Sequence, residues 1–131
     1  MRIVVDSSAI IAILLNEPDA ERLARIFDNG PAACIAAPVF IEAAIVMLAR
    51  KGEPGLLALN EFVRETGLAV SDMNAAQVRH AIDAHRRFGK GRHPAGLNLG
   101  DCYSYALAST LNAPLLFNGE DFARTDLMAA A

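Results

Sequence analysis

Four short apolar runs alternate along the chain with longer segments of helical periodicity, and this order limits the possible fold more than any other feature. The runs are RIVVD (2–6), ACIAA (33–37), LAVSD (68–72) and PLLFN (114–118). Each run is too short to form a helix, and the first is apolar enough to be buried on both faces of a sheet. Strands that are separated by helices predict a three-layer α/β/α fold whose sheet is mainly parallel and has four to five strands.

Residues that favour helix ends mark the segments between these runs. The predicted helices cover residues 7–17, 18–30, 38–52, 53–66, 74–91 and 101–112. Ser7 or Ser8 can cap the first helix, and Asn74 begins a pattern that is similar to a capping box at the start of the fifth. Asp101 is expected to open the last helix.

One domain is expected to span residues 1–131, because this is a common domain size and a hydrophobic fraction of 53% is enough to build a core. Only 6% of the residues are aromatic, so the core should be aliphatic. Asp6 and Asn16 interrupt the apolar start, which argues against a signal peptide, and no stretch reaches the roughly 18 apolar residues of a membrane-spanning helix. The sequence therefore predicts a cytoplasmic protein without a membrane segment.

Four acidic residues stand in otherwise apolar surroundings. They are Asp6 after IVV, Glu42 within VFIEAAIVML, Asp101 before CYSYALA and Asp121 shortly after PLLF. In an open parallel sheet, ligands bind beyond the carboxyl ends of the strands. Asp6 and Asp121 follow predicted strands. The helices that carry Glu42 and Asp101 start at the same edge, so the fold should gather the four acids in one pocket.

Each acid also has an explanation that involves no chemistry. Asp6 and Asp101 could be helix N-caps, because Asp is among the best capping residues. Asp121 lies in the sequence GED, which is typical of a turn because Asp and Gly favour turn conformations. The neighbouring Glu120 indicates that this turn is exposed to solvent. Glu42 is the hardest to explain by structure alone, because residues 39–48 offer little polar helix surface and a buried unpaired carboxylate is costly.

Mutual repulsion within a cluster of carboxylates favours the binding of a cation. Two carboxylates about 5 Å apart repel by roughly 3 kcal/mol at an effective dielectric constant near 20, so four would either take up protons or bind a cation. Mg²⁺ is the expected cofactor and Mn²⁺ could substitute for it, since both ions prefer oxygen ligands. Such a site suits the hydrolysis of a phosphodiester bond with one or two metal ions.

Four sequence blocks hold these acids. They are IVVDSSAIIAILLNEPDAE, APVFIEAAIVM, LNLGDCYSYALA and PLLFNGEDFARTDL, which together cover nearly the whole chain. In their order and spacing they resemble PIN-domain ribonucleases, and specifically the VapC-type toxins of bacterial type II toxin–antitoxin pairs. The resemblance implies a PIN domain over residues 1–131 and an Mg²⁺-dependent endoribonuclease that a cognate antitoxin inhibits.

The resemblance also implies roles for individual residues. The four acids would form the catalytic metal pocket, with Asp6 and Asp101 as the direct ligands. Ser8 and Asn118 would help to orient water or phosphate, although related sequences often carry Lys where this chain has Asn118. The antitoxin would insert a segment, with an Arg, into the acidic pocket and so block metal or RNA.

Basic residues gather just before Asp101, although the net charge of the whole chain is −3. The cations of this segment are Arg86, Arg87, Lys90 and Arg92, in the company of histidines. Taken alone, the segment could be a solvated helix face. Beside a metal site, its cations are expected to guide RNA phosphates and to make binding depend on salt.

Several predicted helices carry more apolar residues than one face can bury in a small domain. Such residues are Ile11, Leu14, Leu15, Val46 and Leu48. Core packing explains most of them, and the surplus predicts a surface for a homodimer or for the antitoxin.

Other classes of protein also cluster acids around Mg²⁺. A receiver-like phosphoacceptor domain pairs consecutive acids after its first strand and needs a late Lys, whereas here Ser7 follows Asp6 and no Lys follows Lys90. A phosphatase of the haloacid dehalogenase type would need Asp-x-Asp at Asp6. The alternative to an enzyme is a catalytically idle PIN-like module that binds RNA or a protein.

Overall fold

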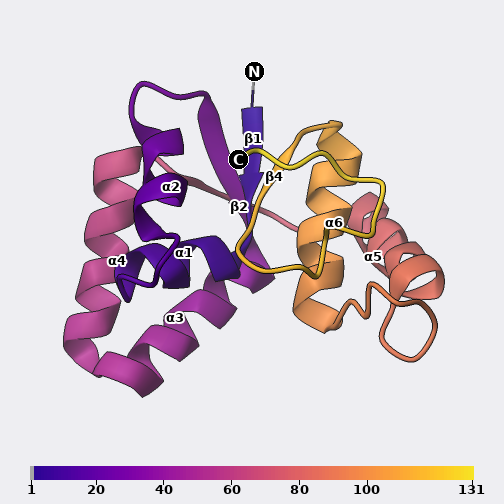
Figure 1. Cartoon of the computed structure of the whole chain (residues 1–131), viewed down its shortest axis with the longest axis horizontal. Helices are drawn as coiled ribbons and strands as arrows, with labels where there is room; N and C mark the ends of the chain where they lie inside the picture. Colours follow the sequence, from indigo (N-terminus) through magenta and orange to yellow (C-terminus); the bar gives the residue numbers. More distant parts are fainter. Residues whose placement is uncertain (1) are drawn as a thin grey trace.

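A parallel sheet forms the centre of the computed structural model, which describes residues 2–131 (Figure 1). The order across this four-stranded sheet is β3 (Ala69–Ser71), β2 (Ala32–Ala36), β1 (Arg2–Val5) and β4 (Leu115–Leu116). Val4 pairs in register with Cys34 on one side and Leu115 on the other. Ala129 adds an isolated parallel bridge to Leu115. The predicted parallel sheet of four to five strands is therefore confirmed.

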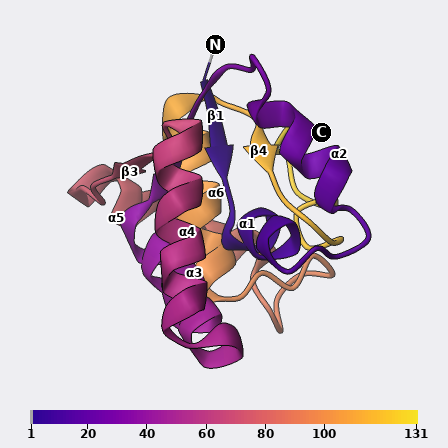
Figure 2. The same cartoon turned by 90° about the vertical axis from the view of Figure 1, so that its left-hand side faces the viewer.

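Helices cover both faces of this sheet. One layer contains α1 (Ser7–Leu14), α2 (Ala20–Ala24), the 3-10 helix η1 (Arg25–Phe27), α3 (Ala37–Lys51) and α4 (Glu53–Thr66), and the other contains α5 (Ala75–Phe88) and α6 (Leu99–Leu111). Figure 2 shows the first layer facing the viewer, with α4 in front of the sheet. The arrangement confirms the predicted three-layer α/β/α fold.

Most helix ends lie where the local sequence predicts them. Gly67 ends α4 in the left-handed conformation at φ +70°, and the Asn74 side chain accepts a hydrogen bond from the Gln77 backbone N–H at the start of α5, at 2.9 Å. The prediction of one continuous helix over residues 18–30 is wrong. The chain forms α2 and then η1 there, and Asn29 at φ +57° turns it towards β2.

The core is aliphatic, as composition predicts. Residues Ile3, Val4 and Val5 of β1 are each at most 2% exposed, because helices cover the strand on both faces. None of the helices within residues 2–131 has the length and apolar character that crossing a membrane would require.

Most of the five apolar residues that we singled out pack within the protein, as expected. Ile11, Leu14, Leu15 and Val46 are half-buried. Leu48 is 38% exposed, and Ile41 and Ile45 on the same helix are 58% and 60% exposed. One part of the exposed apolar surface is therefore a row along α3.

Candidate metal centre

Asp6 is fixed at the carboxyl end of β1 by contacts with two helices. It is 3% exposed and caps α1, where its Oδ2 accepts hydrogen bonds from the Ser8 backbone N–H at 3.1 Å and from the Ser8 hydroxyl at 2.7 Å. Its Oδ1 accepts a short hydrogen bond from the hydroxyl of Ser104 on α6. Asp6 is therefore a helix cap and also a buried carboxylate that contacts the opposite helix layer. Ser104 is a contact that sequence reasoning missed.

Asp101 is held by the first turn of α6, which begins two residues earlier than predicted. Asn98 is the N-cap, and it forms a capping box in which its side chain accepts from the Asp101 backbone N–H at 2.9 Å. In return, Oδ2 of Asp101 accepts the backbone N–H of Asn98 at 3.0 Å. The prediction that Asp101 opens the helix is wrong, because Asn98 with an acid three residues later is itself a helix-start signal.

The carboxylate of Asp101 lies within reach of two other acids. Burial is the largest reason that its pKa rises from the ordinary 3.8 to about 7, and the hydrogen bond from the Asn98 N–H opposes this rise. The negative charges of Asp6 and Asp121 raise the pKa further, as does a side-chain hydrogen bond with Asp121. Asp121 itself is exposed, in the turn after β4. Asp101 on α6 thus interacts with two of the other predicted acids, which come from the end of β1 and from the segment after β4.

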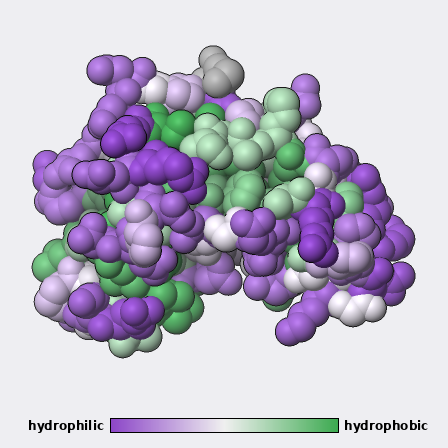
Figure 3. Space-filling view, in the orientation of Figure 1, coloured by the Kyte–Doolittle hydropathy of each residue, from purple (hydrophilic) through white to green (hydrophobic). Residues whose placement is uncertain are grey.

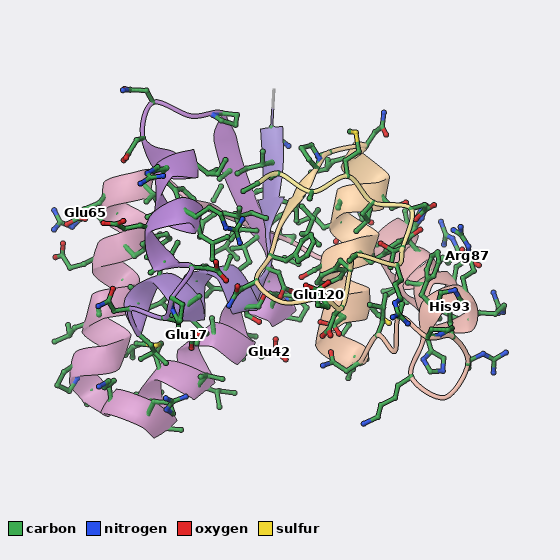
Figure 4. The ribbon with its side chains drawn as sticks, viewed as in Figure 1. Glu17, Glu42, Glu65, Arg87, His93 and Glu120 are labelled. Carbon is green, nitrogen blue, oxygen red and sulfur yellow. The ribbon has the colours of Figure 1, made fainter. Side chains whose placement is uncertain are left out.

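Glu42 reaches the same edge of the sheet from α3 (Figure 4). Its Oε1 accepts a hydrogen bond from the hydroxyl of Ser7 at 2.7 Å. Its carboxylate also lies against the backbone of Gly100 on α6, where an added Cβ would be 2.5 Å from Oε2. A glycine before Asp101 therefore leaves the space that Glu42 occupies.

The environment of Glu42 differs from the expectation. We predicted that its helix offers little polar surface and would leave the carboxylate buried, and this is wrong because Glu42 is exposed. The neighbouring Ile41 and Ile45 are exposed as well. The apolar sequence around Glu42 reflects an open helix face rather than a buried one.

Ser8 and Asn118 connect the acids through hydrogen bonds. The Ser8 hydroxyl donates to Asp6 and accepts the backbone N–H of Asn118 at 3.0 Å, which links α1 to the end of β4. The Asn118 side chain donates to Oε1 of Glu17 at 3.5 Å. Glu17 is an additional acid beside the site that sequence reasoning did not single out.

The donor set fits a hard divalent cation that keeps part of its water. The four acids offer carboxylate oxygens, which Mg²⁺ and Mn²⁺ prefer. Within residues 2–131, no three acidic, histidine or cysteine side chains are grouped closely enough to enclose a metal ion by themselves. Mg²⁺ typically takes one or two carboxylates directly and keeps several waters, so this spacing agrees with its usual mode. Burial is the main cause of the raised pKa of Asp101, and the negative charges of Asp6 and Asp121, which add to the rise, are charges that a cation would neutralise.

The basic segment follows α5 into the loop before α6, close to the residues that start α6. Arg86, Lys90 and Arg92 are exposed there. Arg87 differs, because its guanidinium donates hydrogen bonds to the Tyr105 hydroxyl at 3.1 Å and to a C-terminal aspartate at 3.2 Å. All four cations of the segment are exposed, and Arg87, whose side chain is 46% exposed, is in addition held by these two hydrogen bonds.

Comparison with known proteins adds to this geometry. Residues 3–127 match the family model of the PIN domain. A ribonuclease VapC of Mycolicibacterium smegmatis is 46% identical over 126 residues, which are 96% of this chain and 98% of that protein. The chain belongs to the VapC family of PIN-domain proteins. Membership in this family excludes the receiver-like and haloacid dehalogenase alternatives.

Solved structures share the fold of this VapC-family chain. VapC20 of Mycobacterium tuberculosis, a Sarcin-Ricin loop cleaving toxin, superposes with a TM-score of 0.78 at 18% identity and covers 96% of both chains. A toxin–antitoxin complex from Klebsiella pneumoniae gives a TM-score of 0.69 at 15% identity over 95% of this chain and 92% of that chain. At this identity the two structures support the fold.

Proposed function

We propose that this VapC-family protein is an Mg²⁺-dependent endoribonuclease toxin that a cognate antitoxin inhibits, with Mn²⁺ able to replace Mg²⁺. The observation that carries the proposal is the meeting of Asp6, Asp101 and Asp121 at one end of the sheet, with the pKa of Asp101 raised to about 7. A protein named ribonuclease VapC is 46% identical to this chain, and a structure of the same fold is a Sarcin-Ricin loop cleaving toxin. Both names support RNA as the substrate class.

The four acids would have two different roles in the site. Asp6 and Asp101 are buried and already held by backbone and hydroxyl donors, so they would bind the cation with little further loss of side-chain freedom. A bound Mg²⁺ would polarise the phosphoryl oxygen and help to deprotonate the attacking water. Glu42 and Asp121 are exposed, so they would accept hydrogen bonds from the remaining waters and orient the attacking one.

Two polar residues would support this arrangement. Ser8 would keep the Asp6 carboxylate in position through its hydroxyl, and the backbone N–H of Asn118 would keep that hydroxyl turned towards Asp6. The Asn118 side chain is neutral and contacts Glu17. Its proposed role is therefore to orient groups rather than to supply charge.

RNA cleavage by the purified protein tests this function. We expect a pool of total RNA to be cut in Mg²⁺ or Mn²⁺ and left intact in EDTA, and sequencing of the cut ends would give the target. Asp101→Asn should abolish cleavage. Asp28→Asn is the matched control, because Asp28 is exposed before β2, at the opposite edge of the sheet.

Three results would contradict the proposal. Cleavage that persists in EDTA would exclude a metal mechanism, and an Asp101→Asn variant as active as the parent would exclude the acidic site. RNA binding without any cleavage under either metal would favour the catalytically idle module.

The exposed cations of the basic segment would bind RNA phosphates. Arg86, Lys90 and Arg92 precede the helix that carries Asp101, and Arg87 was predicted to act with them. Replacing all four by Ala should weaken RNA binding and reduce its salt dependence, since each lost phosphate contact lowers the slope of log K against log salt by about 0.7 for a single strand. An unchanged slope would contradict this assignment.

The acidic edge would also be the surface that the antitoxin covers. A guanidinium binds carboxylates through paired hydrogen bonds, so an inserted Arg would compete with the metal for the acids. The toxin–antitoxin complex of the same fold supports such a partner. Co-expression with a small protein encoded beside this one should yield a complex that no longer binds Mn²⁺, whereas a toxin that still purifies alone would contradict the pairing.

We further propose a homodimer that uses two apolar surfaces beside the acidic edge. The first is the row of Ile41, Ile45 and Leu48 on α3, whose spacing places them on one helix face. Figure 3 shows hydrophobic residues exposed in this region, at the lower left over α3 and α4. Such a row gains stability when another copy covers it.

The second surface is a groove of about 690 Å³ between α5 and α6. Val78, Ile82 and Leu99 border it and are 45%, 55% and 69% exposed. The α3 row of one copy can fill the groove of another, and two-fold symmetry would repeat this contact. Sedimentation equilibrium should show a dimer that Ile45→Glu dissociates and that Leu57→Glu on α4 does not; a monomeric parent would contradict the proposal.

A further inference from the structure

The C-terminal segment after β4 carries Asp121 and is anchored on both sides of it. The segment turns at Gly119, where φ is +100°, and Asp121 follows in an exposed bend. Phe122 is 2% exposed and its ring lies 5.2 Å from that of Phe117. Beyond residue 127, the backbone pairs with Leu115 through hydrogen bonds of 2.9 and 2.8 Å.

Between these anchors, Asp126 is bound by side chains of both helices of the second layer. The hydroxyl of Tyr105 on α6 donates to its Oδ1 at 2.7 Å, and the guanidinium of Arg87 on α5 donates to its Oδ2 at 3.2 Å. Arg87 also donates to the Tyr105 oxygen at 3.1 Å, so the three side chains form a closed triangle. Figure 4 shows Arg87 on the far side of α6 from Glu42.

The burial of Tyr105 makes this contact specific. Tyr105 is 2% exposed, and a buried hydroxyl without a partner is costly. Burial and the hydrogen bond to Asp126 raise the pKa of Tyr105 to about 12, and the same hydrogen bond is the largest reason that the pKa of Asp126 is lowered. At neutral pH the triangle therefore consists of a neutral phenol between a carboxylate and a guanidinium.

We propose that Tyr105, Arg87 and Asp126 are positioning residues that hold the C-terminal segment so that Asp121 faces Asp101. The inference rests on the proposed metal site. Asp121 lies in an exposed bend that follows a glycine, so its position depends on the anchors of the segment. Arg87 then acts within the protein, and the RNA contacts of the basic segment belong to Arg86, Lys90 and Arg92.

Mn²⁺ binding, followed by electron paramagnetic resonance, tests the positioning role without a cleavage assay. Tyr105→Phe removes the hydroxyl and keeps the ring, and we expect a two- to tenfold weaker Mn²⁺ affinity, about what the loss of one net hydrogen bond allows. Tyr103→Phe is the matched control, because it removes the same group from the same helix on the side that faces the α5–α6 groove. Its Mn²⁺ affinity should equal that of the parent.

Limited trypsin digestion measures the segment itself. Arg124 is exposed between Asp121 and Asp126, so cleavage after it reports how often the segment leaves the helices. Tyr105→Phe should accelerate this cut, and Tyr103→Phe should not. Faster cleavage with unchanged Mn²⁺ affinity would overturn the proposal, because the triangle would then stabilise the segment without positioning Asp121. A parent that binds no Mn²⁺ would instead contradict the proposed metal site.

Asp126→Asn distinguishes the two possible roles of Arg87, because they predict different changes in kcat and in KM for RNA. If Arg87 positions the segment, the substitution should lower kcat and leave KM for RNA unchanged. If Arg87 binds phosphate, releasing it from Asp126 should lower KM, and the proposal would be wrong. Combining Asp126→Asn with Tyr105→Phe should weaken Mn²⁺ affinity by less than the two single effects added as free energies, because both substitutions act on the same three-residue contact.

Discussion

The buried acids Asp6 and Asp101 differ from the exposed acids Glu42 and Asp121 in what holds them. The buried pair is fixed by donors at the start of a helix, within three residues of each acid, and Asp6 has an additional donor on α6. The exposed pair depends on groups far away in the sequence, such as Ser7 and Gly100 for Glu42. In the proposed metal site, the buried pair would therefore define where a cation binds, while the exposed pair would adjust the water and substrate around it.

The largest difference between the two pairs should be in catalysis. We expect Asp101→Asn to lower kcat about a thousandfold, because it would remove a proposed direct ligand, and Glu42→Gln to lower kcat only about tenfold, as for a group that acts through water. Single-turnover cleavage of one RNA by both variants measures this contrast. Equal losses would show that burial does not separate direct ligands from the others.

Stability should respond to pH through the buried pair. The pKa of Asp101 is raised to about 7 in the folded protein, so between pH 3.8 and that value the folded state holds more protons than the unfolded chain. The free energy of unfolding of the metal-free protein should fall as pH rises through this window. Asp101→Asn should remove this contribution and add about 2 kcal/mol at pH 8, less than the full charge effect because water screens part of it.

Urea denaturation in EDTA at pH 6 and pH 8 checks this sign. Asp121→Asn, a change at an exposed acid, should alter the pH profile much less. The quantity to compare is the free energy of unfolding of the parent minus that of Asp101→Asn at each pH. If this difference were larger at pH 8 than at pH 6, it would contradict the assigned burial of Asp101.

Two serines allow a matched test of the hydrogen bonds to each pair. Ser104 is 1% exposed and donates to Asp6, whereas Ser7 donates to the exposed Glu42. Ser104→Ala should lower the free energy of unfolding by about 1–2 kcal/mol, and Ser7→Ala by less than about 0.5 kcal/mol. Chemical denaturation gives both values; the reverse order would mean that water replaces the buried donor.

The smallest effect is expected at Gly100. An added methyl group would meet the end of the Glu42 side chain, which can swing into solvent, so the substitution should not unfold the protein. Ala favours a helix over Gly, and Gly100→Ala should therefore raise stability slightly, by at most about 1 kcal/mol. Mn²⁺ affinity should fall about twofold as Glu42 moves away. Calorimetry gives both quantities, and an unchanged affinity would remove Glu42 from the site.

Local patterns in the sequence predicted the sheet and the rigid part of the site. The four strands and their parallel order follow from short apolar runs between helices, and Asp6 follows the first run directly. The start of α6 could also have been predicted, because Asn98 and Asp101 have capping-box spacing. The error there came from treating Asp101 as the cap rather than as the partner of the cap.

The remaining features depend on contacts between distant segments. Gly100 matters only because α3 brings Glu42 against it, and neither residue indicates this alone. In the sequence, Arg87 is one more cation of the basic segment. Only the fold brings Asp126, 39 residues later, beside it. Exposure of Glu42 also could not be inferred, since the apolar residues around it are equally compatible with a core and with an open face.

The central position of β1 has a consequence for how the protein is made. β1 is synthesised first but pairs with β4, and Asp6 gains the hydrogen bond from Ser104 and the neighbouring charge of Asp101 only from the last part of the chain. A chain still attached to the ribosome thus carries Asp6 and Glu42 without the acids that would complete the site. The proposed metal site would therefore be complete only after the C-terminal segment has folded onto α5 and α6. Any activity that depends on this site would begin late in the folding of the chain.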